Sequence, residues 1–254
     1  MNQDDGRRAA ATLPLYLTND HPCSYLGDQQ ARTLFVDPLA RIDGDSYGVL
    51  LQHGFRRSGT HVYRPACRHC QRCIPVRLPV ETFRADRSQR RNLRLNRQAV
   101  QIIKRPAMLD AEHYRLYADY VRSRHPDGSM AEEISVDSYY RFLVEPWGGE
   151  SLFLELRLDG RLLAVAVTDV VPDGLSAVYT FFDPARADRA PGTFGVLSQI
   201  DCARRRGLDY LYLGYWIKES HKMRYKDRFR PIEAWNGHQW QSFGKGEPIQ
   251  FPNM

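Results

Sequence analysis

Leucines occupy every second position over residues 152–158, in alternation with Phe153, Glu155 and Arg157, which predicts a β-strand with one consistent apolar face. These leucines are Leu152, Leu154, Leu156 and Leu158. Asp159-Gly160 follows and is a strong signal for a tight hairpin turn. Apolar runs at 162–171 and 176–182 then predict a second and a third strand, so three consecutive antiparallel strands are expected.

A helical pattern follows the three strands. Pro191-Gly-Thr-Phe-Gly195 is expected to form a loop that opens a helix over 196–206, and Gly207 is the residue that ends it. Residues 209–214 then predict a fourth strand. Three antiparallel strands, a glycine-containing loop, a helix and a further strand resemble the central part of GNAT acyltransferases. The pattern therefore predicts an α+β fold with a GNAT-like, mostly antiparallel sheet.

Two helices are expected before the first of these strands. Apolar residues at helical spacing mark the first helix: Tyr114, Tyr117, Ala118 and Val121. A loop containing Pro126-Asp-Gly128 separates it from a short helix over 137–143. Ser135 and Asp137 are the two candidate N-caps of that short helix.

The composition shifts near Pro106, where we place the boundary between two domains. Residues 1–104 are expected to form a smaller, cysteine-containing domain with short strands between polar turns. Residues 105–254 are expected to form the GNAT-like domain.

Composition limits the classes of protein to consider. The chain has 254 residues, of which 43% are hydrophobic, so it can bury the core of one large or two small domains. No apolar run approaches the roughly 20 residues that span a bilayer, and the polar start, residues 1–11, lacks a signal-peptide core. Five cysteines, three of them clustered, fit a reducing compartment. We expect a cytoplasmic protein with no membrane partner.

Three of these cysteines, Cys67, Cys70 and Cys73, have C-x2-C-x2-C spacing. Thiolates at this spacing can converge on one metal, and Cys23 would supply a fourth ligand. Soft sulfur ligands favour an iron–sulfur cluster or zinc. The alternative is a set of reduced thiols without metal. Cys202 falls within the predicted helix and is expected to be a core thiol.

Arginine is concentrated directly after the cysteines, in a chain whose net charge is +6. On a helix, five of these arginines would fall within one stripe: Arg87, Arg90, Arg91, Arg94 and Arg97. Such a stripe repels itself unless it faces phosphates, although a solvated charged face is the usual role of a charge run. Asp86 is the one acidic neighbour in sequence. The stripe therefore predicts contact with a nucleic acid.

Two further segments carry candidate binding groups. Free backbone N–H groups at the start of the helix after the glycine loop would bind the terminal phosphate or ribose end of an activated donor. That loop contains Gly192, Thr193, Phe194 and Gly195, and its alternative role is a simple turn. Cations cluster after the fourth strand, and they suit a carboxylate or a phosphate backbone. They are Lys218, Lys222, Arg224 and Lys226.

Motifs along nearly the whole chain resemble the aminoacyl-tRNA–protein transferases of the N-degron pathway, and most closely their bacterial leucyltransferase branch. The motifs that carry this resemblance are His21-Pro-Cys-Ser-Tyr-Leu26, Tyr63-Arg-Pro-Ala-Cys67, Tyr139-Tyr-Arg-Phe-Leu143, Tyr179-Thr-Phe-Phe-Asp-Pro184, Leu211-Tyr-Leu-Gly-Tyr-Trp-Ile217 and Lys222-Met-Arg-Tyr-Lys-Asp-Arg-Phe-Arg-Pro231. The arginyl branch has a C-x2-C near its start, where this chain has Cys23 and then Leu26. That difference favours the leucyl branch.

The resemblance implies an enzyme that moves leucine from Leu-tRNA to the α-amine of proteins with N-terminal Asp or Glu. The transfer chemistry itself needs no cofactor, because the tRNA ester is already activated. Three alternatives stay open. They are an arginyltransferase of the same family, an acetyltransferase that uses acetyl-CoA, and a non-enzymatic, metal-dependent module that binds tRNA.

The resemblance also suggests roles for residues near the third and fourth strands. Asp183 is a candidate to hold or deprotonate the acceptor amine, although a turn residue before Pro184 would look the same. Tyr179 is the second catalytic candidate. Tyr179, Phe181 and Trp216 are candidate walls of the leucyl pocket, and core packing is the alternative for each. The acidic side chain of the acceptor needs cations, and the candidates are Lys222, Arg224 and Lys226.

Overall fold

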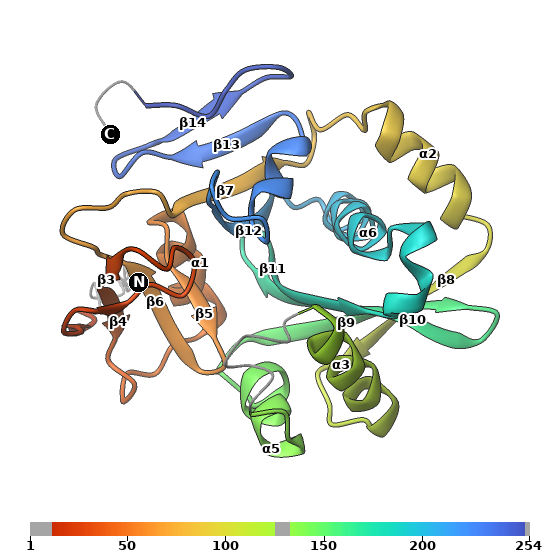
Figure 1. Ribbon diagram of the computed structural model, residues 1–254, viewed down its shortest axis with the longest axis horizontal. Helices are drawn as coiled ribbons and strands as arrows, with labels where there is room; N and C mark the ends of the chain where they lie inside the picture. Colours follow the sequence, from red (N-terminus) through yellow and green to blue (C-terminus); the bar gives the residue numbers. More distant parts are fainter. Residues whose placement is uncertain (1–11, 125–132, 252–254) are drawn as a thin grey trace, which may run out of the picture.

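The computed structural model describes residues 12–124 and 133–251. Its centre is an eight-stranded sheet with the strand order β14-β13-β7-β12-β11-β10-β9-β8 (Figure 1). Neighbouring strands are antiparallel except for β11 and β12, which are parallel. The sheet consists of β7 (Ile74–Pro79), β8 (Val100–Pro106), β9 (Glu150–Leu158), β10 (Arg161–Val171), β11 (Gly174–Phe182), β12 (Tyr210–Trp216), β13 (Ile232–Trp235) and β14 (Trp240–Phe243). This arrangement confirms the expected α+β fold with a mostly antiparallel sheet.

The β9–β10 hairpin forms where the sequence predicts it. Asp159 and Gly160 both have positive φ, at 50° and 76°, as a two-residue type I′ turn requires. The prediction of a single apolar face was incomplete. Leu154 packs with residues of α6 (Pro191–Arg205) on one side of the sheet, while Phe153 is fully buried against α3 (Ala111–Arg124) on the other. Helices therefore cover both faces of the sheet centre (Figure 1).

The predicted helices are present, with one correction. Ser135 is the N-cap of α5 (Val136–Tyr139), which continues as a π-helical turn, Tyr140–Val144. The loop predicted around 126–128, like the polar start of the chain, lies outside the described residues. The helix predicted at 196–206 is α6, which begins earlier, at Pro191. The expected glycine loop is therefore the first turn of that helix, because Pro is well placed at N1.

The remaining helices and strands surround this sheet. The N-terminal part forms a four-stranded sheet with the order β1-β4-β6-β5 and a two-stranded pair, β2-β3. These strands are β1 (Leu15–Leu17), β2 (His21–Pro22), β3 (Gln30–Ala31), β4 (Thr33–Val36), β5 (Arg56–Ser58) and β6 (His61–Pro65). The other helices are α1 (Gly44–Gln52), α2 (Arg87–Asn96) and two short 3-10 turns, η2 (Pro184–Arg189) and η3 (Arg224–Arg228). Among the described residues, no helix is long and apolar enough to cross a membrane.

The boundary predicted after residue 104 lies inside β8. Residues 74–106 supply β7 and β8 to the large sheet, and α2 between them packs on α6. β7 is an interior strand, since it pairs with both β12 and β13. Residues 74–104, which were assigned to the N-terminal domain, are therefore part of the eight-stranded sheet. The boundary between the four-stranded and the eight-stranded sheet lies between β6 and β7.

Candidate functional site

The two parallel strands β11 and β12 separate after a short common stretch. They pair from Gly174 to Ser176 with Tyr210 to Tyr212, and no register continues beyond these residues in the described chain. Strands that diverge leave backbone carbonyls without ladder partners, and buried carbonyls need other donors. This opening is the candidate site, because it is where the central sheet offers unpaired polar groups.

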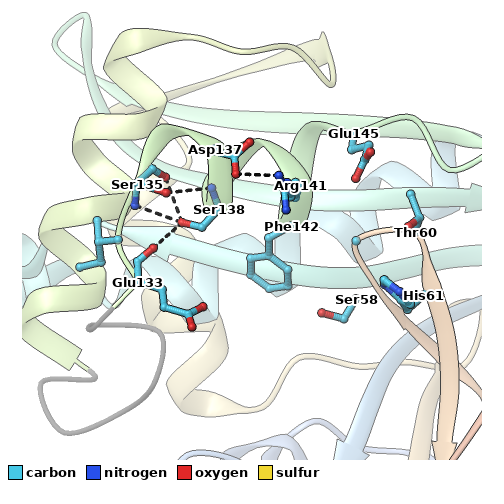
Figure 2. Close-up of a pocket in the computed structure, with 12 residues that line it drawn as sticks. Ser58, Thr60, His61, Glu133, Ser135, Asp137, Ser138, Arg141, Phe142 and Glu145 are labelled. Carbon is cyan, nitrogen blue, oxygen red and sulfur yellow. Dashed lines mark hydrogen bonds and ion pairs between the residues drawn. The ribbon is translucent and has the colours of Figure 1, made fainter.

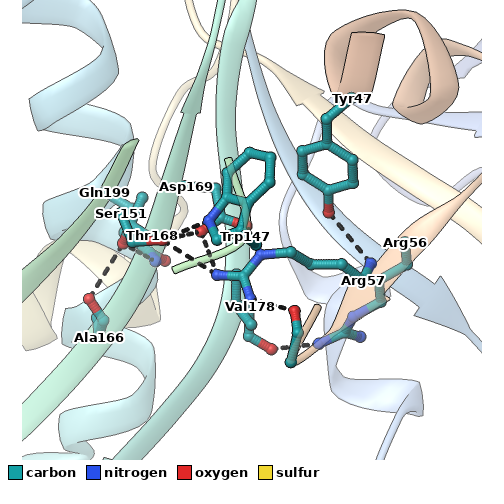
Figure 3. A network of polar contacts seen from close by, with 11 residues as sticks. Tyr47, Arg56, Arg57, Trp147, Ser151, Ala166, Thr168, Asp169, Val178 and Gln199 are labelled. Atoms are coloured by element: carbon teal, nitrogen blue, oxygen red, sulfur yellow. Dashed lines mark hydrogen bonds and ion pairs between the residues drawn. The ribbon is translucent and has the colours of Figure 1, made fainter. Parts of the chain in front are cut away.

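Two cations supply donors to the edges of the opening. The guanidinium of Arg56, from β5, donates to the carbonyl of Val178 on β11 (Figure 3). The ammonium of Lys226, from η3, donates to the carbonyl of Tyr215 on β12 at 2.5 Å. Gly214 makes room for the first of these, because a Cβ there would come within 3.0 Å of the Arg56 Cζ. Each strand edge is thus completed by a cation from another segment.

Arg56 reaches the opening because its neighbour is fixed on the other side of β5. The Arg57 guanidinium is buried among Asp169 of β10, Ser151 of β9 and the ring of Trp147, which lies 5.0 Å from its Cζ (Figure 3). Successive side chains of a strand point to opposite faces. The same short strand therefore docks the N-terminal part on the sheet and brings a cation to the opening.

Lys226 differs from the other cations that the sequence grouped with it. It is 4% exposed, and its pKa lies well below the usual value because burial disfavours the ammonium and the Arg56 guanidinium repels it. Lys222 and Arg224 are exposed, and Arg224 contacts His221 at 3.0 Å. The structure therefore separates the predicted acceptor-binding set into one buried cation and two surface cations.

The hydroxyl of Tyr179 is buried, and it has no hydrogen-bond partner among the described residues. Its ring packs against Phe142 and Tyr120, at centroid distances of 5.2 and 6.1 Å. Burial raises the pKa of this phenol, and the charge of Arg56 acts in the opposite direction. A buried hydroxyl without a partner costs about 1–3 kcal/mol, so Tyr179 is the strongest candidate to contact a substrate.

A cavity of about 600 Å³ lies on the other side of Phe142. Its walls are the β5–β6 turn, residues 58–61, and residues 133–145 (Figure 2). Asp137 and Arg141 form an exposed ion pair at 3.1 Å on its rim. Phe142 lines the cavity and also packs on Tyr179, so the ring of Phe142 lies between the cavity and the candidate site.

Three other predicted site residues lie in surroundings that agree with the structural alternative given for each of them, namely core packing or a turn. Phe181 is fully buried among Tyr117 and other residues on the α3 side, whereas Trp216 belongs to the core on the α6 side. The structure does not bring these two rings together. The Asp183 carboxylate accepts a hydrogen bond from the backbone N–H of Ala185 at 2.9 Å and caps η2. That contact matches the turn alternative, while its catalytic role stays a prediction.

The first turn of α6 has no side-chain cap, which leaves its N-terminal N–H groups available. Gly195 allows this turn to lie close to β11, since a Cβ there would be 3.4 Å from Thr180 Cγ2. Phe194 is buried in the core, and Gly192 and Thr193 are partly exposed. The predicted donor-binding segment therefore divides into a packed half and an accessible half.

The predicted arginine stripe lies on α2, and all five of its arginines are exposed. The opposite face of α2 is buried and polar. Gln89 donates to the Arg228 carbonyl at 3.0 Å, while Asn92 and Asn96 donate to the Arg189 carbonyl at 2.9 and 3.0 Å. Within the described chain, no carboxylate forms an ion pair with the stripe. These hydrogen bonds from side-chain amides fix the arginine stripe next to the turn that precedes α6.

Three of the N-terminal thiols, those of Cys23, Cys67 and Cys70, lie near the fourth, Cys73. Its pKa is raised to about 12, chiefly by burial and in addition by the charges of Cys23, Cys67 and Cys70. All four cysteines are free and partly buried, and Cys202 is buried in the core as expected. In the part of the chain that the structure describes, however, no three His, Cys, Asp or Glu side chains are placed to share a metal ion. The thiols as they lie do not form a metal site, and metal binding stays a prediction.

Sequence reasoning missed Arg56 and did not indicate that Lys226 is buried, while the substrate-binding role of Lys226 stays a prediction. One signal was available for the first: Gly214 interrupts an otherwise apolar strand, and a glycine inside a strand often marks the close approach of another group.

Comparison with known proteins gives one family over most of the chain. Residues 21–91 match the family model described as arginine-tRNA-protein transferase, N terminus, and residues 112–236 match the model of its C terminus. Proteins named aspartate/glutamate leucyltransferase are close in sequence. The relative from Marinobacter nauticus is 50% identical over 91% of this chain and 96% of its own, and that from Pseudomonas aeruginosa is 49% identical over 91% and 97%.

Likeness to solved structures is weaker. The C-terminal domain of a lysylphosphatidylglycerol synthetase from Agrobacterium fabrum aligns with a TM-score of 0.42 and 14% identity, over 57% of this chain and 46% of that one.

Proposed function

The chain belongs to the arginine-tRNA-protein transferase family, and from this membership we propose that it transfers leucine from Leu-tRNA to proteins that begin with Asp or Glu. The observation that carries the proposal is the similarity to proteins named aspartate/glutamate leucyltransferase, at 47–50% identity over 91% of the chain. The transfer marks the acceptor for N-degron proteolysis. Five free cysteines support a reducing compartment, and we place the protein in the cytoplasm.

The reaction exchanges an ester for an amide. The neutral α-amine of the acceptor attacks the carbonyl carbon of the leucyl ester, the new C–N bond forms, and the bond to the tRNA 3′-terminal ribose oxygen breaks. The amine loses a proton and the ribose oxygen gains one. An α-amine has a reference pKa near 7.7–8.0, so a weak base suffices, and the enzyme contributes mainly positioning and charge stabilisation. No cofactor takes part in this exchange.

The opening between β11 and β12 is the proposed place of the transfer. The Tyr179 hydroxyl, which lacks a partner among the described side chains, is proposed to hydrogen-bond the reacting groups. Arg56 lies close enough to act on the charge of this phenol. Lys226 is proposed to support the strand edge, and the exposed Lys222 and Arg224 to receive the acidic side chain of the acceptor.

The exposed arginines of α2 are proposed to bind phosphates of the tRNA. Their charge is not neutralised by ion pairs in the described residues, and the helix is fixed against the turn that precedes α6. Arginine side chains that face solvent in one stripe are suited to a polyanion.

A transfer assay tests the proposal. The protein is incubated with radiolabelled Leu-tRNA or Arg-tRNA and with peptides that begin with Asp, Glu, Lys or Ala. We expect leucine on the Asp and Glu peptides. Preferential use of Arg-tRNA would make the chain an arginyltransferase, and equal labelling of the Ala peptide would contradict the acceptor specificity. Binding of tRNA without transfer would identify a binding module, and acetyl transfer from acetyl-CoA would identify an acetyltransferase.

A further inference from the structure

A second cavity, of about 330 Å³, lies at the N-terminal end of α2. Its walls come from three segments that are distant in sequence: the start of α2, the end of η3 and the turn after β14. They bring together five cations, which are Arg84, Arg90, Arg228, Arg230 and Lys245. Asp86 is the one carboxylate of the lining, and it accepts a hydrogen bond from the Gln89 N–H at 2.7 Å as the N-cap of α2.

The arginines of this cavity are oriented by backbone carbonyls. Arg84 donates to the Glu81 carbonyl at 2.6 Å, Arg90 donates to the Ala85 carbonyl at 2.8 Å, and Arg230 donates to the Asp227 carbonyl at 2.7 Å. Over residues 12–124 and 133–251, none of the five cations forms an ion pair with a carboxylate. The carboxylates nearest these cations are Asp86, which caps α2, and Asp227 and Glu247, whose charges act on Arg230. Five cations therefore exceed the nearby negative charge, and guanidinium groups in such surroundings are suited to an oxyanion, above all to phosphate.

α2 connects this cavity to the first turn of α6. The side-chain amide of Gln89 donates a hydrogen bond to the Arg228 carbonyl at the cavity. The side-chain amide of Asn96 donates one to the Arg189 carbonyl just before α6. Asn92 also donates to the Arg189 carbonyl, so this carbonyl lies between three and seven positions from Gln89, which is about 5 to 10 Å along an α-helix. A stacked strand of nucleic acid advances roughly 3.4 Å per nucleotide, so this length corresponds to about one to three nucleotides.

We propose that this cavity binds a backbone phosphate of the tRNA acceptor end, within about three nucleotides of the first turn of α6, the candidate binding segment for the terminal ribose of the donor. The proposal rests on the proposed function and extends it. It adds Arg84, Arg228, Arg230 and Lys245 to the arginine stripe on α2 as groups that bind phosphates of the RNA. It also explains why the last turn of η3 is tied to α2, since both must move together to keep the cavity intact.

The test removes two exposed charges from the cavity without touching the stripe. The variant is Arg228→Gln with Lys245→Gln, and the control is Arg115→Gln with Arg122→Gln, two exposed arginines on α3 across the sheet. The dissociation constant is measured for full-length Leu-tRNA and for a leucylated minihelix that contains only the acceptor stem and its 3′ end. For the variant Arg228→Gln with Lys245→Gln, we expect the dissociation constant to rise about tenfold for both RNAs, since loss of a charge-assisted contact weakens binding by about 1.4 kcal/mol.

The salt dependence should change as well. The slope of log K against log salt should become less steep by about 0.7–0.9 for one lost phosphate contact, and the control should keep the wild-type slope. Urea unfolding of both double variants checks that the fold is intact.

Several outcomes would overturn the proposal. They are an equal effect in the control, a loss seen with full-length tRNA but not with the minihelix, and binding of inorganic phosphate with unchanged RNA affinity. A rise in KM for the acceptor peptide instead of for Leu-tRNA would assign the cavity to the acidic N-terminus of the acceptor. If the wild-type protein transfers no leucine, the proposed function fails, while the binding measurements still decide what the cavity holds.

Discussion

The guanidinium of Arg57 contacts the carboxylate of Asp169 at two points, with distances of 2.6 Å from Nε to Oδ2 and 2.5 Å from Nη2 to Oδ1. Both side chains are at most 1% exposed, so this ion pair is completely enclosed. It joins β5 of the N-terminal sheet to β10 of the large sheet, and it thereby sets the position of Arg56 at the opening.

Asp169→Asn should destabilise the protein by about 3–5 kcal/mol, because it leaves the Arg57 charge buried without its counter-charge. Urea unfolding measures the change. The control is Asp119→Asn, which breaks an exposed ion pair with Arg122 at 3.4 Å and should change stability by less than about 1 kcal/mol. Equal changes in the free energy of unfolding would show that the buried ion pair contributes no more to stability than the exposed one.

Gly214→Ala should abolish most transfer activity. Gly214 has φ of +73°, and an added Cβ would overlap the Arg56 guanidinium and displace it from the Val178 carbonyl. Gly207→Ala is the matched control, because its φ is +68° and no atom lies within 4 Å of the added Cβ. Both variants should lose about 1 kcal/mol from backbone strain, and activity should fall further in Gly214→Ala alone. Similar activity in both would remove Arg56 from the proposed site.

Tyr179→Phe should lower the transfer rate without lowering stability. The substitution removes a buried hydroxyl that has no partner among the described residues, so the free energy of unfolding should stay constant or rise by about 1 kcal/mol. Tyr139→Phe is the control, since Tyr139 also has a buried hydroxyl without a partner but lies fully inside the core. Full activity of Tyr179→Phe would leave this hydroxyl with no role in the reaction.

Replacing Arg90 and Arg91 by Ala should raise the apparent KM for Leu-tRNA and flatten its dependence on salt. Each lost phosphate contact should reduce the slope by about 0.7–0.9, because fewer counterions are released on binding. Kinetics at several salt concentrations provide the measurement. An unchanged slope together with a loss of folding would show that these arginines are structural.

Metal binding at the thiols is tested by elemental analysis of protein purified without oxygen. We expect iron or zinc, because three thiols, those of Cys23, Cys67 and Cys70, lie near the thiol of Cys73, and thiolates bind both metals. Cys70→Ser should lose part of the metal, whereas Cys202→Ala, in the core, should retain it. Metal-free anaerobic protein would agree with the present positions of the side chains, which do not converge on one ion.

Local signals in the sequence predicted the elements near the site well. Leu152 and its alternating neighbours predicted β9, and Asp159-Gly160 predicted the hairpin. The arginine spacing indicated one face of a helix, which is α2, whereas the role of Asp86 as its N-cap was not predicted. The strand, the hairpin and the helix are each decided by residues within a few positions of one another. Period and turn chemistry are therefore sufficient to predict them.

The composition of the site could not be predicted in the same way. Arg56 bonds to Val178, which is 122 positions away, and β7 pairs with β12 and β13, which are more than 130 positions away. Such contacts leave no periodic trace in a single sequence. The burial of Lys226 could not be predicted either, because the neighbouring cations in the sequence are exposed and nothing local distinguishes Lys226 from them.

The interior position of β7 has a consequence for synthesis on the ribosome. The chain is made from residue 1 onward, so β7 emerges about 130 residues before β12 and still longer before β13, the two strands that flank it. During this interval both edges of the apolar strand are unpaired, a condition that favours aggregation. The central sheet can close only when nearly the whole chain has left the ribosome. Early release of the nascent chain, or cutting it between 104 and 105 to express the two parts separately, would leave a strand without its partners.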